Sequence, residues 1–595
     1  MPVEPVELLK LIIGLIILTI PGYFWGYLFS KQLTHLERVV FGFLCGLAFF
    51  IISTFALNII FNIKITQTIV WILYIFLLIP AAIIYIISFF GYKLPKITLN
   101  FFKNKTMIIL ILILIFVFIM MFLPHLSNNY YLPFHVDEWI HYSYTRAIIE
   151  QGTTTFIDPY TGIGTINFPE VGFHITNACL HWISTSNLST IFIFMPAILG
   201  VFLSLTAFII GERSPRKFGL EAAFLIAFIP TTVRLLGPSF YTASTLSLIF
   251  LLFIIWLAQI KITQSIILIP FFIFTIFLIH PITALVGIGI LLVYSLFLVI
   301  EKEYRFALMI GGLTVLPIIL VVLFTSRWNT IVDDFLNSLS GQQYPLVFNL
   351  PKISIYYTDL GFLPWILLII GVYYAFIKKK TLLQKTLSIS IIAFIIVIGL
   401  YDKFSYGYFA IYERLFMYLF LIVCLIGAYG LSEIRQTLTD LIKKKKYQHI
   451  RKKIKNLNII IPVIIAIVIL LIAVPAHLDI SYYEMITEEE YETYTWIHDN
   501  IDEYRDTNHT YQRAAVNPYK ASPFSAVTGL YIISSSMNPI YGYELVGNMR
   551  TFLREKCTNT SFLDKYQISV IYGVANNSNF TMIHDKVYLY PGLFE

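Results

Sequence analysis

Long apolar runs recur along most of the first 475 residues of this chain, and they constrain its fold more than any other feature. Each run has roughly 18 to 25 residues, which as a helix is long enough to cross a hydrocarbon core about 30 Å thick. Only 13% of the 595 residues are charged, against about 25% in ordinary soluble domains. The sequence therefore predicts an α-helical integral membrane protein.

The apolar runs predict about fourteen transmembrane helices. Their approximate positions are 8–30, 38–60, 67–90, 106–123, 189–210, 218–236, 240–260, 263–280, 282–300, 307–325, 362–377, 384–401, 410–432 and 458–475. The residues after 475 differ in kind, with an acidic helical start at 484–504 and strand-like runs at 513–516 and 568–572. A tail of about 120 residues is enough for one small α/β domain.

We therefore divide the chain into four regions. They are an N-terminal three-helix transmembrane unit at 1–105, a transmembrane core at 106–325 with a first outer loop at 125–188, a second outer loop with the remaining transmembrane helices at 326–475, and a soluble α/β domain at 476–595.

The connecting loops predict the orientation, because Lys and Arg are retained on the cytoplasmic side. Four connections are rich in these residues: 93–105, 213–217, 378–385 and 443–455. With fourteen spans all four fall on one face, so we expect both termini, the first outer loop and the tail to be extracytoplasmic in a multi-pass cell-membrane protein. The net charge of +7 then follows from topology and gives no support to nucleic-acid binding. The acidic start, with Glu4 and Glu7, argues against a cleaved signal peptide.

The first outer loop opens with two adjacent carboxylates between two histidines, in the sequence Phe-His-Val-Asp-Glu-Trp-Ile-His from 134 to 141. We expect Asp137 to cap a surface helix that ends at Gly152. Asp137 and His141 then lie one turn apart on a shared face, with His135 just upstream. A structural interpretation makes Asp137 only a cap and Glu138 a solvated neighbour; the functional interpretation makes this cluster a reaction centre.

Four further ionisable residues are candidates for substrate binding. Glu170 lies in an aromatic and proline-containing segment of the same loop, and His280 precedes Pro281 between two spans. Arg414 opens the thirteenth span, where an ionisable residue indicates function, although snorkelling or an ion pair with Glu413 also explains it. Arg234 is a second candidate cation. A lone histidine at a position like that of His280 is more often a satisfied turn residue.

This layout resembles the GT-C superfamily of polytopic glycosyltransferases, which includes protein O-mannosyltransferases, aminoarabinose transferases and oligosaccharyltransferases. The resemblance covers about residues 106–595 and is carried by the Asp137-Glu138 pair after a span, the surface helix, the many later helices and the soluble tail. It implies a sugar donor linked to a polyprenyl phosphate or diphosphate and chemistry on the outer face. Arg414 is similar to the late-helix arginine that contacts the lipid-linked phosphate in this superfamily.

The chemistry of inverting sugar transfer gives these residues roles. A sugar hydroxyl is a poor nucleophile, so a carboxylate must take its proton while the lipid phosphate leaves from the other side of C1. We assign Asp137 as this base, with Glu138 tuning it or holding the acceptor, and expect His135, His141, Glu170, Arg234, His280 and Arg414 to bind substrate. The acceptor is a glycan, a lipid or a protein.

We expect no cofactor. His135, Asp137 and His141 are plausible ligands for Mg²⁺ or Mn²⁺. The resemblance also makes a metal possible, because oligosaccharyltransferases of this superfamily use one. This chain departs from that subgroup, because the segment Gly237 to Ser244 lacks a second acidic cluster and the tail has no Trp-Trp-Asp signature. Hard cations need several oxygen ligands. We therefore favour metal-independent transfer of a single sugar over oligosaccharide transfer.

Two other classes of protein remain open. A lipid or glycan transporter or flippase would also have many spans, but internal repeats and mid-membrane ionisable groups would be expected. A non-catalytic protein of cell-envelope assembly would need neither Asp137 nor Arg414. The clustering of the charged candidates at the outer ends of spans favours the enzyme.

Overall fold

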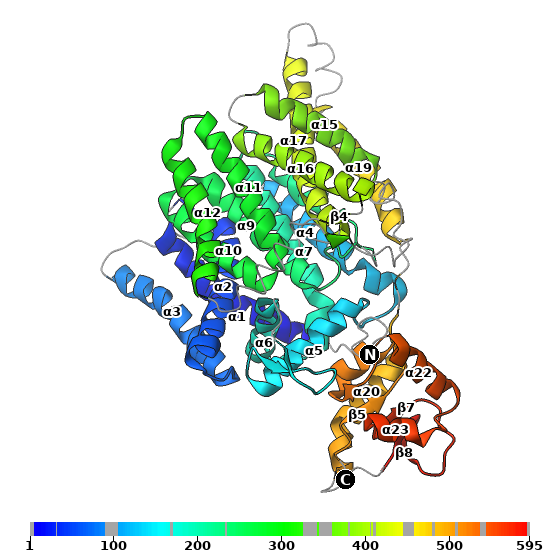
Figure 1. Ribbon diagram of the computed structural model, residues 1–595. Coiled ribbons are helices and arrows are strands. Elements are labelled where there is room, and N and C mark those ends of the chain that lie inside the picture. Colours follow the sequence, from blue (N-terminus) through cyan, green and yellow to red (C-terminus); the bar gives the residue numbers. More distant parts are fainter. Residues whose placement is uncertain are drawn as a thin grey trace.

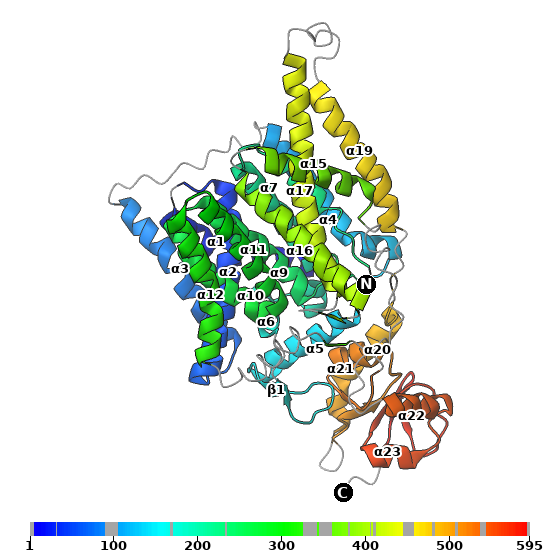
Figure 2. The ribbon, with the colours of Figure 1, turned by 45° about the horizontal axis from the view of Figure 1, so that its top comes forward.

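The computed structural model describes most of the chain (Figures 1 and 2). The described residues are 5–30, 32–89, 105–166, 170–232, 235–324, 342–343, 360–378, 381–404, 406–407, 412–443, 457–478, 482, 484–505, 510–535 and 543–591. Most of the second outer loop predicted from 326 lies outside these ranges, as do the basic residues 93–104 and 444–455.

A large bundle of helices makes up most of the molecule. Its helices are α1 (Pro5–Phe29), α2 (His35–Phe61), α3 (Gln67–Phe89), α4 (Lys105–Asn128), α5 (Val136–Gln151), α6 (Val171–Ser184), α7 (Leu188–Arg213), α8 (Gly219–Ile226), α9 (Ala243–Ile260), α10 (Thr263–Ile279), α11 (Pro281–Ile300), α12 (Tyr304–Phe324), α15 (Phe362–Ile377), α16 (Leu382–Phe404), α17 (Tyr412–Lys443) and α19 (Leu457–Leu478). Within the described ranges, nine helices are long and apolar enough to cross a membrane, and four shorter apolar helices accompany them. The prediction of a polytopic helical membrane protein is confirmed at this level.

The transmembrane helix predicted over 218–236 is wrong. Helix α8 ends at Ile226, and the chain from Phe228 to Thr231 is buried without helical structure. Pro230 explains part of this difference, because proline has no N–H to donate and disfavours a helical residue before it. The carbonyl of Thr231 accepts a hydrogen bond from Tyr482, which leads into the tail. Irregular backbone is tolerated here because surrounding protein buries it.

The three N-terminal helices support α6. Helices α1 and α2 approach closely at two glycines: a Cβ atom on Gly22 would lie 2.3 Å from the carbonyl oxygen of Gly42. All three helices contact α6. The Glu7 carboxylate of α1 accepts a hydrogen bond of 2.8 Å from the backbone N–H of Asn187, just beyond α6. The N-terminal unit is therefore packed onto an element of the central bundle.

Helix α17 connects two chemically different ends of the bundle. Arg414 lies in its first turn, and Glu433 lies nineteen residues further along, which is about 28 Å in a helix. The Glu433 side chain is fully buried and pairs with Arg216, at 2.9 Å, and with Lys378. These two cations come from separate basic connections in the sequence. The structure therefore brings two of the four basic loops to one end, away from Arg414.

The tail, coloured orange to red in Figure 1, contains helices and a five-stranded sheet. Its elements are α20 (Glu488–Asn500), the 3₁₀-helix η3 (Ile501–Tyr504), β5 (Arg513–Ala515), α21 (Ala521–Thr528), β6 (Tyr531–Ile532), α22 (Tyr543–Arg554), α23 (Thr560–Tyr566), β7 (Val570–Tyr572), β8 (Thr581–His584) and β9 (Val587–Leu589). The strand order is β6-β5-β7-β9-β8, with β5 parallel to β6 and β7, and β9 antiparallel to β7 and β8. The helix predicted at 484–504 and the two predicted strands are observed.

Two short antiparallel pairs of strands lie outside the helices. They are β1 (Phe156–Ile157) with β2 (Thr165–Ile166), and β3 (Gln342–Gln343) with β4 (Tyr406–Gly407). The first pair belongs to the first outer loop, and the carbonyl of Tyr160 in its turn accepts a hydrogen bond of 2.6 Å from Ile532 of the tail sheet. The outer loop and the tail are thus hydrogen-bonded to each other.

Arg146 of α5 makes the most extensive polar contact between the bundle and the tail. Its Nη1 donates to the carbonyls of Ala526, at 3.1 Å, and Val527, at 2.7 Å, in the last turn of α21. Its Nε contacts Glu150, and its Nη2 lies 3.1 Å from His498 of α20. A guanidinium at a helix C-terminus satisfies carbonyls that have no partner within the helix. Helix α5 is thereby fixed to the tail.

We expect Arg146→Met to loosen this contact. The variant keeps the length and packing of the stem but removes charged hydrogen bonds to two carbonyls, at a cost of about 2 kcal/mol. The melting temperature of the purified protein should fall, and a protease should cleave the tail faster. Arg505→Met, which removes an exposed pair with Asp502, is the control and should change neither. Equal behaviour of the two variants would contradict this role of Arg146.

Candidate active site

The start of α5 is held by a reciprocal capping box between His135 and Glu138. The N-cap is His135, whose ring accepts a hydrogen bond from the backbone N–H of Asp137, while the Glu138 carboxylate accepts one from the backbone N–H of His135. Asp137 is inside the first turn, so its prediction as the cap is wrong. The imidazole takes this role because its Nδ1 lies 3.1 Å from the backbone nitrogen of Asp137, in the first turn. The predicted stop at Gly152 is confirmed by its left-handed backbone.

The first turns of five helices meet at one cavity of about 410 Å³. The helices are α5, α6, α9, α11 and α17. The lining residues are Asp137, Ile140, His141, Tyr144, Glu170, Leu236, Thr242, Ala243, Ser244, His280, Pro281, Ile282 and Arg414. The N-terminus of each helix carries roughly half a positive charge, so these helix ends oppose the negative charge of Asp137 and Glu170 in the lining. Anionic groups are favoured there, whether they belong to the protein or to a ligand.

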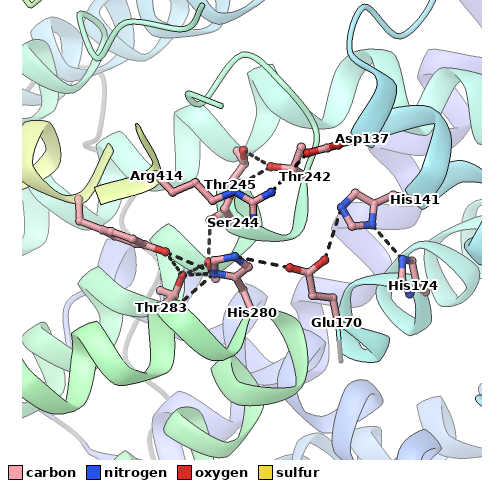
Figure 3. Close-up of polar contacts among 12 residues, drawn as sticks. Asp137, His141, Glu170, His174, Thr242, Ser244, Thr245, His280, Thr283 and Arg414 are labelled. Atoms are coloured by element: carbon pink, nitrogen blue, oxygen red, sulfur yellow. Dashed lines mark hydrogen bonds and ion pairs between the residues drawn. The ribbon is translucent and has the colours of Figure 1, made fainter. Parts of the chain in front are cut away.

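Asp137 and Arg414 face each other across this cavity (Figure 3). The Nη2 atom of Arg414 lies 3.5 Å from Oδ2 of Asp137. Both side chains are a little over one-quarter exposed, at 28% for Asp137 and 29% for Arg414. The pair is therefore accessible to a ligand, although 277 residues separate the two positions in the sequence.

A second carboxylate, Glu170, lies between two imidazoles. Its Oε2 atom is 3.7 Å from Nε2 of His141, and its Oε1 atom is 3.5 Å from Nε2 of His280. His141 contacts a further imidazole, His174, at 3.0 Å. His280 caps α11: its Nδ1 accepts from the backbone N–H of Thr283. That bond places the proton of the neutral His280 ring on Nε2, where it faces Glu170.

Burial sets the protonation of this cluster. Desolvation raises the pKa of Glu170 to about 7, although Arg414 acts in the opposite direction. Desolvation lowers the pKa of His141 to about 4 and that of His174 well below the ordinary histidine range. The imidazoles are therefore neutral near pH 7, and Glu170 changes its charge close to neutral pH.

Glu138 points away from the cavity. It is only 3% exposed, and its Oε1 atom accepts a hydrogen bond of 2.8 Å from the backbone N–H of Tyr241. With the bond to His135, both carboxyl oxygens are occupied by backbone donors. Desolvation raises its pKa to about 7 despite these bonds. In this arrangement Glu138 ties the start of α5 to the segment before α9.

The structure brings together most of the predicted site residues. Asp137, His141, Glu170, His280 and Arg414 line the cavity. His135 and Glu138 are placed beside it, in the cap of α5. Arg234 lies outside the described residues, so its predicted role stays a prediction.

Sequence reasoning missed the hydroxyl groups of Thr242 and Ser244, which also line the cavity. Thr242 is the N-cap of α9, and its side chain makes no capping hydrogen bond. The available signal was a Thr-Ala-Ser sequence directly before an apolar run, which is typical of a helix start.

Among the residues that the structure describes, no group of three His, Cys, Asp or Glu side chains is arranged to hold a metal ion. Glu170 with His141 and His280 comes nearest in residue type. In this group each imidazole nitrogen lies 3.5 or 3.7 Å from a carboxylate oxygen of Glu170, so the side chains face one another directly.

Solved structures with a similar fold are archaeal oligosaccharyltransferases. The apo oligosaccharyltransferase of Archaeoglobus fulgidus matches with a TM-score of 0.54 and 14% identity, over 79% of this chain and 70% of that one. The same organism's AglB, in complex with an inhibitory peptide and a dolichol-phosphate, matches with a TM-score of 0.51 and 14% identity, over 79% and 69%. At this identity the likeness shows the fold alone. A comparison with curated proteins gives no match.

Fold and cavity together define a polytopic helical membrane protein whose fold is similar to that of an archaeal oligosaccharyltransferase, with a candidate site where the first turns of several helices meet. A family model matches residues 15–514, most of the chain. The chain belongs to that family, described as a family of unknown function (DUF6541).

We expect Glu170→Gln to change how stability depends on pH. Because the pKa of Glu170 rises from 4.5 to about 7 on folding, the folded wild type binds more protons than the unfolded chain between these pH values. Its stability relative to the variant should therefore be greatest near about pH 5 and fall by up to about 3 kcal/mol as the pH rises through 7. Thermal unfolding of both proteins across this range measures the difference.

The buried histidines act in the opposite direction, but both proteins carry them and their effect cancels in the comparison. Glu488→Gln, which removes an exposed carboxylate of the tail, is the matched control. A difference between wild type and Glu170→Gln that is constant with pH would contradict the assigned protonation of Glu170.

Proposed function

We propose that this protein is a membrane glycosyltransferase that moves a sugar from a polyprenyl-phosphate-linked donor to an acceptor, with inversion at the anomeric carbon. The observation that carries the proposal is the meeting of Asp137 and Arg414 in one cavity at the ends of five helices. A base and a cation are the two groups that this reaction needs, one on each side of the transferred sugar.

The reaction forms a bond between the acceptor oxygen and C1 of the sugar while the bond from C1 to the phosphate oxygen breaks. The carboxylate of Asp137 takes the proton of the acceptor hydroxyl. The electron pair of the broken bond leaves with the lipid phosphate, whose charge Arg414 stabilises through its forked donors. Because attack and departure occur on opposite faces, no glycosyl-enzyme intermediate is required.

The other residues of the cavity are compatible with Asp137 as the base and Arg414 as the phosphate-binding cation. Glu170, with a pKa of about 7, can be neutral when the phosphate is present, which reduces repulsion between the two. His141 and His280 hold its carboxyl group from two sides. Tyr144 adds an aromatic surface to the wall of the cavity, which suits contact with a sugar ring.

We infer that the cavity end faces the outside of the cell. The two basic connections that meet at Glu433 are at the other end of α17, where the retention of Lys and Arg predicts the cytoplasm. The tail is hydrogen-bonded to α5 and therefore lies on the same side as the cavity. This placement makes the acceptor an extracytoplasmic glycan, lipid or protein.

We favour transfer of a single sugar without a metal. The segment that leads into α9 provides hydroxyl groups at the cavity, from Thr242 and Ser244, and no carboxylate. The A. fulgidus structures that share the fold are oligosaccharyltransferases, and the AglB complex contains a dolichol-phosphate. We extend the lipid-linked donor class to this chain and propose a smaller transferred group.

We expect Asp137→Asn to lower the rate of transfer by about 10²- to 10⁴-fold, because the amide cannot accept the proton. Release of polyprenyl phosphate from a panel of labelled polyprenyl-phosphate-linked monosaccharides, in membranes that hold the native acceptors, measures the reaction for any acceptor. Asp440→Asn, an exposed change near the far end of α17, is the control. Unaltered release by a normally inserted Asp137→Asn protein would remove Asp137 as the base.

Arg414→Lys tests the cation. Lysine keeps the positive charge but loses the planar fork that contacts two phosphate oxygens, so kcat/KM for the donor should fall by about tenfold. Arg414→Ala should lose more. Arg435→Lys makes the same change on the same helix, where Arg435 pairs with Glu221 at 3.1 Å, and should leave the reaction unaffected. Equal activity of the Arg414 variants and the wild type would exclude Arg414 from donor binding.

A further inference from the structure

We propose that the tail is N-glycosylated on the side that faces away from the helix bundle, with Asn559, Asn576 and Asn579 as the acceptors. Each of these residues opens an Asn-X-Ser/Thr triplet, which is the acceptor motif of N-linked glycosylation. The inference does not depend on the reaction proposed above. It depends on the extracytoplasmic placement of the tail, because this motif is used in surface loops on that side of a membrane.

The three triplets lie in exposed loops. Asn559 immediately precedes α23, and Asn576 and Asn579 lie between β7 and β8. The side chain of Asn559 does not cap α23. All three asparagines are exposed. The hydroxyl residues that complete the triplets are exposed as well, and they are Ser561, Ser578 and Thr581. Both parts of the motif are therefore accessible to a modifying enzyme.

Hydrogen bonds bring the two loops together. The backbone N–H of Asn576 donates to the carbonyl of Lys556 at 2.9 Å, and the side chain of Asn577 donates to the carbonyl of Thr558 at 3.3 Å. The loop before α23 and the loop before β8 are thus neighbours, although the second bond joins positions 19 residues apart. Figures 1 and 2 show α23 on the side of the tail away from the bundle. The triplets therefore share one face of the tail.

A fourth triplet among the described residues differs from these three. Asn187 precedes α7, and Ser189 completes its motif. The Asn187 side chain caps the helix by accepting a hydrogen bond of 2.7 Å from the backbone N–H of Thr190. Ser189 is only 2% exposed, and its hydroxyl lies 2.6 Å from that of Tyr491. Because the hydroxyl of this triplet is buried, we expect Asn187 to remain unmodified.

Exposed apolar side chains lie beside the triplets of the tail. Val574 is 60% exposed two residues before Asn576, and Met582 is 62% exposed directly after Thr581. These two are the most exposed of the large apolar side chains described in the tail. A glycan is bulky and solubilising. Sugars on the neighbouring asparagines would therefore shield these side chains from contact with other proteins.

The modification is a transfer of an oligosaccharide from a lipid-linked donor. A bond forms between the side-chain amide nitrogen of the asparagine and C1 of the oligosaccharide, while the bond from C1 to a phosphate oxygen of the donor breaks. The electron pair of the broken bond leaves with the lipid phosphate, and the amide proton passes to a base of the transferring enzyme. We assign this step to a separate oligosaccharyltransferase of the cell, because the triplets face away from the bundle that contains Asp137 and Arg414.

Mass spectrometry of the full-length protein, purified from the membranes of the organism that produces it, tests the proposal. Peptides with Asn559, Asn576 and Asn579 should contain an Asn-linked oligosaccharide, and the peptide with Asn187 should not. Ser561→Ala keeps Asn559 but removes its motif, so it should abolish modification of Asn559, whereas Ser561→Thr should retain it. Thr560→Ala changes the middle residue of the same triplet, leaves the motif intact and is the matched control.

Each outcome supports or overturns a stated part of the proposal. Unmodified peptides at all three positions in the tail would overturn it. A glycan on Asn187 would contradict the selection of acceptors by exposure of the hydroxyl. Modification of Asn559 that survives Ser561→Ala would overturn the assignment to N-linked transfer at this motif. Protease cleavage of the tail in intact cells locates the tail independently, so that a wrong orientation is distinguished from wrong acceptor sites. Melting temperatures confirm that each variant is folded.

Discussion

The convergence of five helix N-termini on one cavity is the constraint on which the rest of the site depends. Free N–H groups buried at the end of a helix need acceptors, and water is scarce inside a bundle. The protein meets this need in different ways. His135 and Glu138 cap α5, His280 caps α11, and Asp137 and Glu170 supply negative charge. The N-caps of α6 and α9, Glu170 and Thr242, make no side-chain capping hydrogen bond.

The helices that carry the cavity residues are anchored by other parts of the chain. Helix α6 carries Glu170 at its start, and the three N-terminal helices pack along it. Helix α5 carries Asp137 and is fixed at its other end to the tail by Arg146. Helix α17 carries Arg414 and is anchored at the far end by the buried Glu433 with two cations. Asp137, Glu170 and Arg414 are therefore each carried by a helix that other parts of the protein anchor through contacts away from the site.

Sequence reasoning found what local patterns encode and missed what long-range packing decides. Apolar length predicted most spans, and the glycine at 152 predicted the end of α5. Apolar length gave a wrong prediction at 218–236, where α8 ends at Ile226 and the segment with Pro230 does not continue the helix. Asp137 and Arg414 were singled out separately, but their contact across 277 positions is visible only in the structure. The Thr and Ser residues at the start of α9 predict a helix start but not their place in the cavity, because Ser and Thr are ordinary at helix starts.

The ion pair of Asp137 with Arg414 links the two halves of the proposed reaction. Before a donor binds, the guanidinium lies 3.5 Å from the carboxylate and neutralises it. In the proposed reaction, the negatively charged phosphate of the donor competes with Asp137 for the same guanidinium. Donor binding in that reaction therefore releases Asp137, and an acceptor hydroxyl that enters an empty site meets a carboxylate still paired with Arg414. That order of events would protect the lipid-linked sugar from premature reaction, because activation and occupancy depend on the same arginine.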